Sequence, residues 1–221
     1  MIAFAVVSLA LAAGGVAEFK AAFPSASVVE SPAGGRLTHA SGFEALGLGR
    51  EPEAAARAFL ARWGSAFGVS PRQQLVARGG PARGQLGPVR FERRIEGWPL
   101  FDGDVVVGVD GRNAVTLVNG SDVPSRVSGR ARLSRKVAIR AARSAIAGLE
   151  TSDTPRARRG WRAAGDAIRP VWRVELTATR PAGDWRTDVD AETGAVLWRA
   201  DLRVNRAAPG FAPRPARTPG R

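Results

Sequence analysis

The chain has 221 residues, of which 44% are hydrophobic and 24% charged, a composition typical of a globular protein with one large or two small domains. The formal net charge is +13, and all but two of the 33 Lys and Arg residues are arginine, which favours association with acidic partners without identifying one. The absence of cysteine excludes disulfides, thiolate chemistry and the cysteine-based zinc motifs.

The N-terminus has the pattern of a signal peptide. Ile2 to Ala13 is an almost continuous apolar run, and Gly15-Val16-Ala17 provides a cleavage site of small residues. We therefore expect residues 1–17 to direct secretion or transfer to the periplasm, although no Lys or Arg precedes the run and a buried N-terminal helix is the alternative. The run is too short to span a bilayer, so no stable membrane insertion is expected.

An irregular segment and then a helix follow the apolar run. Residues 18–49 are rich in Gly, Ser and Pro, and we expect irregular chain there with one short strand at Leu37 to His39. Pro52 lies at a favourable first helical position, with Glu51 and Glu53 beside it. Apolar residues then recur at helical spacing up to Phe67, so the helix is expected to end near Gly68.

Between Leu75 and Val118 the apolar residues recur at every second position, the spacing of a β-strand. Val105, Val107 and Val109 are expected to share one face of a strand, and Asp110-Gly111 predicts the turn into the next strand. The pattern predicts an antiparallel meander. The stretch 121–132 is poor in apolar residues and is the expected domain boundary.

The second half repeats this order. Ser134 is the expected cap of a helix with apolar residues three and four apart, and residues 151–165 form an expected polar loop. Strands are expected at 171–179, 185–190 and 195–204, the first with Arg173 and Glu175 on a solvated face. Residues 205–221, rich in proline, are expected to be a disordered tail.

The first half contains a family motif. The stretch from Phe91 to Val107, FERRIEGWPLFDGDVVV, together with Asp110-Gly111 and Val118-Asn119-Gly120, resembles the propeptide domain of fungalysin and thermolysin, the FTP domain. The resemblance assigns residues 50–122 to such a domain. Arg93 stands where that family usually has glutamine, and we expect it to be solvated; Trp98 stands where a small aliphatic residue is usual.

The second half is similar to the PepSY domain that accompanies the FTP domain in many pro-regions. Residues 172–176 resemble its first strand, and residues 185–197 contain a Val-Asp-Ala-x-Thr-Gly hairpin, which assigns residues 133–204. The two resemblances imply an α+β fold with two cystatin-like units, each a helix packed on a curved antiparallel sheet. They also imply a pro-region that acts as inhibitor and folding chaperone of a metalloprotease.

The sequence contains no residues for a catalytic zinc site. Such a site needs His-Glu-x-x-His and a third ligand, and the chain has one histidine, His39. We therefore expect no catalytic residue, no metal, no cofactor and no enzymatic activity. Asp188-x-Asp190-x-Glu192-x-Gly194 resembles a calcium loop, but its glycine is misplaced, and a hairpin turn explains the same residues.

The remaining candidates concern binding. Trp98, Leu100, Phe101 and Asp104 surround a Gly/Pro turn and are the expected partner-binding residues. The Arg156 to Arg162 cluster contains Trp161, but no nucleic-acid partner is favoured, because a chain this rich in arginine forms clusters by chance.

The expected partner is a metalloprotease catalytic domain, bound in cis or in trans. Two alternatives stay open. The chain is a secreted or envelope binding module that shares only the fold, or it is the N-terminal fragment of a full metalloendopeptidase whose catalytic domain follows Arg221.

Overall fold

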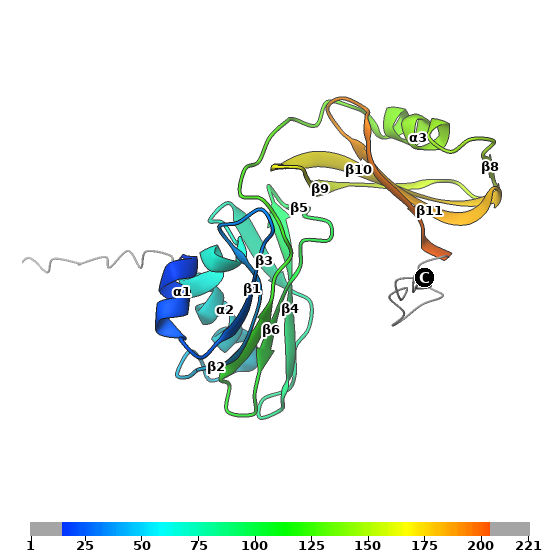
Figure 1. Cartoon of the computed structure of the whole chain (residues 1–221). Helices are drawn as coiled ribbons and strands as arrows, with labels where there is room; N and C mark the ends of the chain where they lie inside the picture. Colours follow the sequence, from blue (N-terminus) through cyan, green and yellow to red (C-terminus); the bar gives the residue numbers. More distant parts are fainter. Residues whose placement is uncertain (1–14, 204–221) are drawn as a thin grey trace, which may run out of the picture. The chain divides into compact units, whose positions relative to one another are not determined.

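The computed structural model describes residues 15–203, which divide into two compact units (Figure 1). Unit 1 contains the chain up to Gly129 and also Gly160–Arg169, whereas unit 2 contains Arg130–Arg159 and the chain from Pro170 onward. The expected signal peptide, except for its last residues 15–17, and the expected tail at 205–221 lie outside the described residues.

Unit 1 is built on one antiparallel sheet with strand order β1-β2-β7-β6-β4-β3, in which the short β5 pairs with β4. Its elements are α1 (Val16–Ala22), β1 (Ser27–Glu30), β2 (Leu37–Ala45), α2 (Pro52–Trp63), the 3₁₀ helix η1 (Gly64–Phe67), β3 (Gln73–Ala77), β4 (Gly87–Ile95), β5 (Trp98–Pro99), β6 (Val105–Val109) and β7 (Val115–Asn119).

The predicted helix and meander of unit 1 are confirmed. Pro52 is the first residue of α2, and Gly68 ends the helical segment with φ 69°, a left-handed conformation that glycine adopts without strain. Along β6 the residues Val105, Val107 and Val109 are fully buried while those between them are half-buried, as period two requires. These valines form one core with α2.

Residues 18–49 are more regular than the sequence had suggested, and the short strand expected at Leu37 to His39 is the beginning of the longer strand β2. They contain most of α1 and the strands β1 and β2, and β2 pairs with β7 in the middle of the sheet order. Phe19 of α1 is fully buried, and its ring centroid lies within 6.4 Å of the rings of five aromatic residues: Phe23, Phe43, Phe59, Trp63 and Phe67. This packing, rather than local helical periodicity, accounts for α1.

Unit 2 consists of the helix α3 (Arg135–Ser144) and a second antiparallel sheet with order β12-β11-β10-β8, in which β9 pairs with β10. The strands are β8 (Glu150–Thr151), β9 (Arg156–Ala164), β10 (Ala167–Arg180), β11 (Ala182–Asp190) and β12 (Val196–Asp201). Both units therefore combine helix and antiparallel sheet, which confirms the α+β class.

Helix α3 has the expected cap, and Ala138 and Ala142 of the expected apolar set are its buried residues, whereas Val137 of that set is exposed. The Ser134 hydroxyl accepts a hydrogen bond from the Val137 N–H, and Ala138 and Ala142 are fully buried against Val174 and Val189 of the sheet. None of the helices among residues 15–203 is long and apolar enough to cross a membrane.

The segment expected as a polar loop at 151–165 is mostly strand β9. The strand was not recognised in the sequence because its apolar face begins with a small residue, Ala157, which lies between arginines. Ala157 packs on the core of unit 2, while the long arginine side chains beside it are exposed. At Gly160 the chain passes into unit 1, so β9 and β10 each contain residues of both units.

Candidate partner-binding surface

A tight turn joins β4 to β5 and presents Trp98. Ile95 and Trp98 pair across the turn, and the two residues between them, Glu96 and Gly97, have φ of 51° and 78°. Positive φ at both central residues is what a type I′ hairpin turn requires. Trp98 is 41% exposed, and it is the only aromatic residue among the exposed large hydrophobic side chains of residues 15–203.

Leu100 and Phe101, by contrast, are buried. Segment 160–169 returns to unit 1 here: the Trp161 indole N–H donates to the Ile95 carbonyl at 2.9 Å, and the Phe101 N–H donates to the Trp161 carbonyl at 2.8 Å. Ile95, Leu100 and Trp161 share a small core with Val123 and Ile168. The predicted apolar cluster therefore separates into one exposed residue and two that support it.

Gly160 allows this close approach. A Cβ atom added at Gly160 would lie 2.5 Å from the Phe101 ring and 2.7 Å from the Pro99 carbonyl oxygen. Side chains larger than hydrogen are excluded at this position unless the turn moves.

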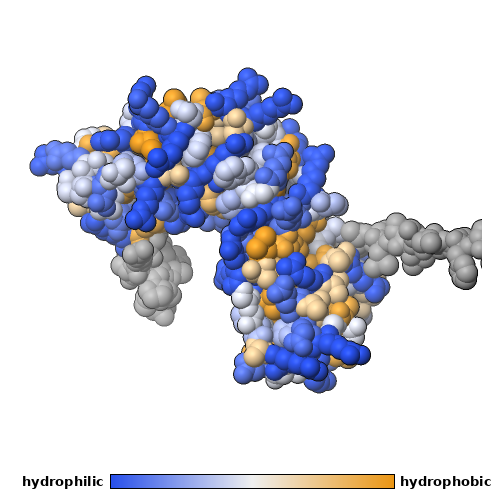
Figure 2. All heavy atoms as spheres, turned by 180° about the vertical axis from the view of Figure 1, so that it is seen from behind, coloured by the Kyte–Doolittle hydropathy of each residue, from blue (hydrophilic) through white to orange (hydrophobic). Residues whose placement is uncertain are grey.

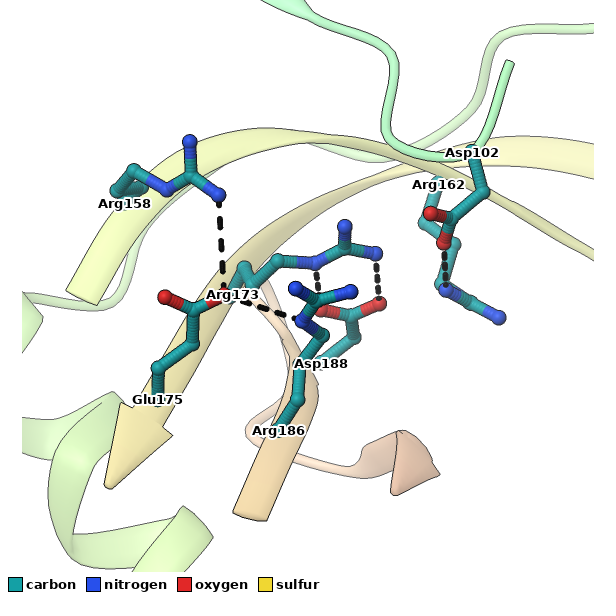
Figure 3. A network of polar contacts seen from close by, with 7 residues as sticks. All are labelled: Asp102, Arg158, Arg162, Arg173, Glu175, Arg186 and Asp188. Atoms are coloured by element: carbon teal, nitrogen blue, oxygen red, sulfur yellow. Dashed lines mark hydrogen bonds and ion pairs between the residues drawn. The ribbon is translucent and has the colours of Figure 1, made fainter. Parts of the chain in front are cut away.

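Two ion pairs border the turn. An Arg90 guanidinium nitrogen lies 3.1 Å from the Asp104 carboxylate. An Arg162 guanidinium nitrogen lies 2.8 Å from the Asp102 carboxylate, as Figure 3 shows. Of the four predicted partner-binding residues, Trp98 and Asp104 thus reach the surface, with Asp104 engaged by Arg90.

Arg93 is not solvated, which corrects the expectation from the sequence. Its side chain is fully buried on the core side of β4, and its guanidinium donates to the Phe67 carbonyl at 3.2 Å and the Gly68 carbonyl at 3.1 Å. These carbonyls end the η1 helix, where backbone acceptors lack helical partners. Burial lowers the pKa of Arg93 to about 10, while the Asp104 carboxylate opposes that shift.

The face of the β10–β11 pair opposite α3 carries paired charges. Arg173, expected to be solvated, is buried and binds Asp188 through two nitrogen–oxygen contacts of 2.8 Å. Next to this pair, Glu175 lies 3.0 Å from Arg186 and 3.8 Å from Arg158 (Figure 3). Register produces this ladder, because Arg173 faces Asp188 and Glu175 faces Arg186 across the strands.

The acidic residues that resemble a calcium loop have other roles. Asp188 binds Arg173, and the Asp190 carboxylate accepts the N–H groups of Glu192 and Thr193 at 2.8 and 2.9 Å. These bonds form the turn between β11 and β12, as the hairpin interpretation predicted.

His39 and the arginine cluster also have structural positions. The His39 ring lies on β2 between the Asn119 amide oxygen, at 2.6 Å, and the Ser41 hydroxyl, at 2.9 Å. Within residues 15–203 there is no group of three or more His, Asp or Glu side chains placed to hold a metal ion. Trp161 is 4% exposed, so its ring is enclosed by unit 1.

Two features of this surface were not predicted from the sequence. The first is the packing of segment 160–169 over Leu100 and Phe101, which joins parts of the chain that are far apart in sequence. In the sequence, only the apolar residues Trp161 and Ile168 indicated that this segment is buried. The burial of Arg93 had no sign in the strand pattern beyond its position in phase with Phe91 and Ile95.

Comparison with known proteins identifies one motif. Residues 83–121 match the model of the Fungalysin/Thermolysin Propeptide Motif; the match contains strands β4 to β7 and the turn that presents Trp98. The C-terminal domain of Bacillus megaterium YpeB aligns with 80% of this chain and 81% of its own, with 14% identity and a TM-score of 0.33. No curated protein matches the chain.

Proposed function

We propose, from the fungalysin/thermolysin propeptide motif in residues 83–121, that the chain is the pro-region of a secreted zinc metalloprotease. In this role it binds a protease catalytic domain, restrains its activity and assists its folding, in cis or in trans. The motif is the observation that carries the proposal.

The β4–β5 turn is the contact that we propose for the protease. Trp98 is a large, partly exposed aromatic side chain on a two-residue turn, and aromatic residues of this kind dominate the energy of many interfaces. Leu100 and Phe101 hold the turn from beneath, so little conformational entropy is lost when a partner binds. Asp104 and its partner Arg90 provide a polar rim.

A preformed sheet also suits the proposed chaperone role. The motif strands lie within a sheet whose core includes α1 and α2, so the binding surface is ordered by burial elsewhere in unit 1. A partner that folds against it gains a rigid template.

The experiment is an inhibition assay against a thermolysin-like or fungalysin-like protease from the same source. Trp98→Ala is expected to raise the inhibition constant by about 30-fold, the effect of losing one central interface residue. Leu86→Ala is the matched control, because Leu86 is an exposed apolar residue of the same motif, at 76% exposure, and is not part of the turn.

The outcomes separate the alternatives. Loss of inhibition in Trp98→Ala alone supports the turn as the contact, whereas equal effects of both variants refute it. If the unmodified chain neither slows the protease nor assists its refolding, the pro-region proposal fails and the chain is a binding module of another kind.

A further inference from the structure

The positive charge of the chain is unevenly distributed. Residues 15–129 contain 13 basic and 11 acidic residues, whereas residues 130–159 contain nine basic and two acidic residues. A general preference for arginine explains the abundance of basic residues but not the near absence of acidic ones in this segment. Helix α3 lies in its first half.

The exposed face of α3 carries a row of cations. Lys136, Arg140 and Arg143 are exposed and recur at intervals of four and three residues, so they form one row along the helix. None of the three forms an ion pair with another side chain of residues 15–203, although Arg143 donates to the Thr151 hydroxyl at 3.4 Å. We call this row the α3 basic row.

Most of these charges weaken the helix that carries them; only Arg143, in the last turn, is favoured by the helix dipole. Like charges three or four residues apart repel, and Arg135 and Lys136 lie in the first turn, where the helix dipole disfavours cations and no acidic residue offsets them. The Ser134 cap and the packing of Ala138 and Ala142 hold the helix in place. Stability therefore does not explain the charge of this face, which suggests a binding role.

Aliphatic side chains accompany the cations on unit 2. Val137, next to Lys136, is 40% exposed. Val196 of β12 is 38% exposed and pairs with Val189, a residue that packs on α3, so it belongs to the same face of the sheet. Figure 2 shows one face of the molecule, on which hydrophilic residues cover most of the surface and hydrophobic residues lie in smaller patches among them.

We propose that this face of unit 2 binds anionic lipid bilayers at their surface. A row of basic side chains is attracted by anionic headgroups, and an exposed valine beside it gains by partial burial at the interface. A nucleic acid would use the same charges, but the face presents no exposed aromatic ring among residues 15–203 for base stacking. The apolar side of α3 is occupied by its own sheet, so the contact is peripheral and sensitive to salt.

The test is binding of the full chain to phosphatidylcholine vesicles with and without phosphatidylglycerol. The variant Lys136→Gln/Arg140→Gln/Arg143→Gln is expected to lose about tenfold or more of its affinity for the anionic vesicles. Its control, Arg50→Gln/Arg72→Gln/Arg83→Gln, removes the same charge from exposed positions of unit 1 and is expected to change affinity less than about threefold. The apolar run Ile2 to Ala13 is present in every variant, so differences report on α3.

Two further measurements separate a loss of binding from a loss of folding, and lipid binding from DNA binding. The α3 variant should unfold at the same or a higher denaturant concentration, because repulsion is removed, which distinguishes lost binding from lost folding. Val137→Ser should weaken vesicle binding by about twofold to fivefold and leave binding to duplex DNA unchanged.

The proposal is overturned if phosphatidylglycerol does not increase binding or if both triple variants lose affinity equally. It is also overturned if duplex DNA binds more tightly than the vesicles and Val137→Ser changes neither. None of these outcomes depends on whether the chain inhibits a protease.

Discussion

Arg93 joins the motif strand β4 to the end of the η1 helix. A guanidinium is rarely buried without a carboxylate partner, because the cost of removing its charge from water is large. Here two backbone carbonyls and the negative end of a short helix replace that partner, with Asp104 contributing attraction from farther away. Arg93 therefore holds the sheet against the helical layer.

We expect Arg93→Ala to lower the free energy of unfolding by about 2–4 kcal/mol, since it leaves the Phe67 and Gly68 carbonyls without donors and opens a cavity. Arg93→Gln retains an amide donor and should cost less. Urea unfolding measures both, with the half-buried Arg94→Ala as control. An unchanged midpoint in Arg93→Ala would contradict the buried position.

Asp122 gives unit 1 a dependence on acid pH. Its carboxylate accepts from the Ser31 hydroxyl at 2.7 Å and from Arg36 at 2.8 Å, and these bonds hold the pKa of Asp122 below its usual value despite some desolvation. Because the pKa of Asp122 is lower in the folded chain than in the unfolded chain, its ionised form stabilises the fold at pH values above the unfolded-state pKa. This stabilisation is lost as the pH falls through the folded-state pKa.

We therefore expect the unmodified chain to lose more stability than Asp122→Asn when the pH falls from about 6 to about 3, across the range where aspartate in an unfolded chain takes up its proton. Unfolding midpoints at several pH values measure the difference. Parallel pH profiles for the two proteins would exclude a contribution from Asp122.

At the scale of elements, sequence periodicity predicted α2, α3 and β6 because each has a complete local pattern: a first-turn Pro52, a Ser134 cap, alternating valines. It missed α1 and β9. A helix from Val16 to Ala22 is too short to be stable alone and depends on the aromatic core that receives Phe19.

Phe19→Ala should consequently destabilise unit 1 by about 3–5 kcal/mol, as expected for a fully buried phenylalanine. Lys20→Ala removes only an exposed ion pair with Glu30 and should change stability by less than about 1 kcal/mol. Denaturant titrations of the two variants compare them directly; equal losses would show that α1 does not belong to the core.

At the scale of the whole molecule, the sequence indicated two consecutive domains, and the chain instead crosses from one unit to the other three times. The first crossing, at Gly129, lies within the predicted boundary at 121–132. The later crossings, at Gly160 and Arg169, depend on contacts of Trp161 and Ile168 with residues far away in the chain, which no local pattern encodes. The prediction of the candidate surface was the least accurate for the same reason, because segment 160–169 buries Leu100, which had been predicted to bind a partner.

A chain that ends at Gly129 should therefore be less stable than unit 1 of the full chain, although Gly129 lies at the boundary between the units. It lacks Trp161 and Ile168, so Ile95, Leu100 and Val123 lose their cover and the Phe101 N–H loses its acceptor. We expect fast amide exchange at Phe101 and binding of a hydrophobic dye by residues 15–129, and neither in residues 15–203. Protection of Phe101 in the shorter chain would refute the role of segment 160–169.

The return of segment 160–169 to unit 1 also sets an order of events during synthesis. A ribosome adds about 5–20 residues each second, so the propeptide motif is complete in the growing chain for several seconds before Trp161 is made. During that interval Leu100 lacks the cover that Trp161 and Ile168 provide in the finished chain. Unit 1 thus reaches its final form only when translation has passed Arg169.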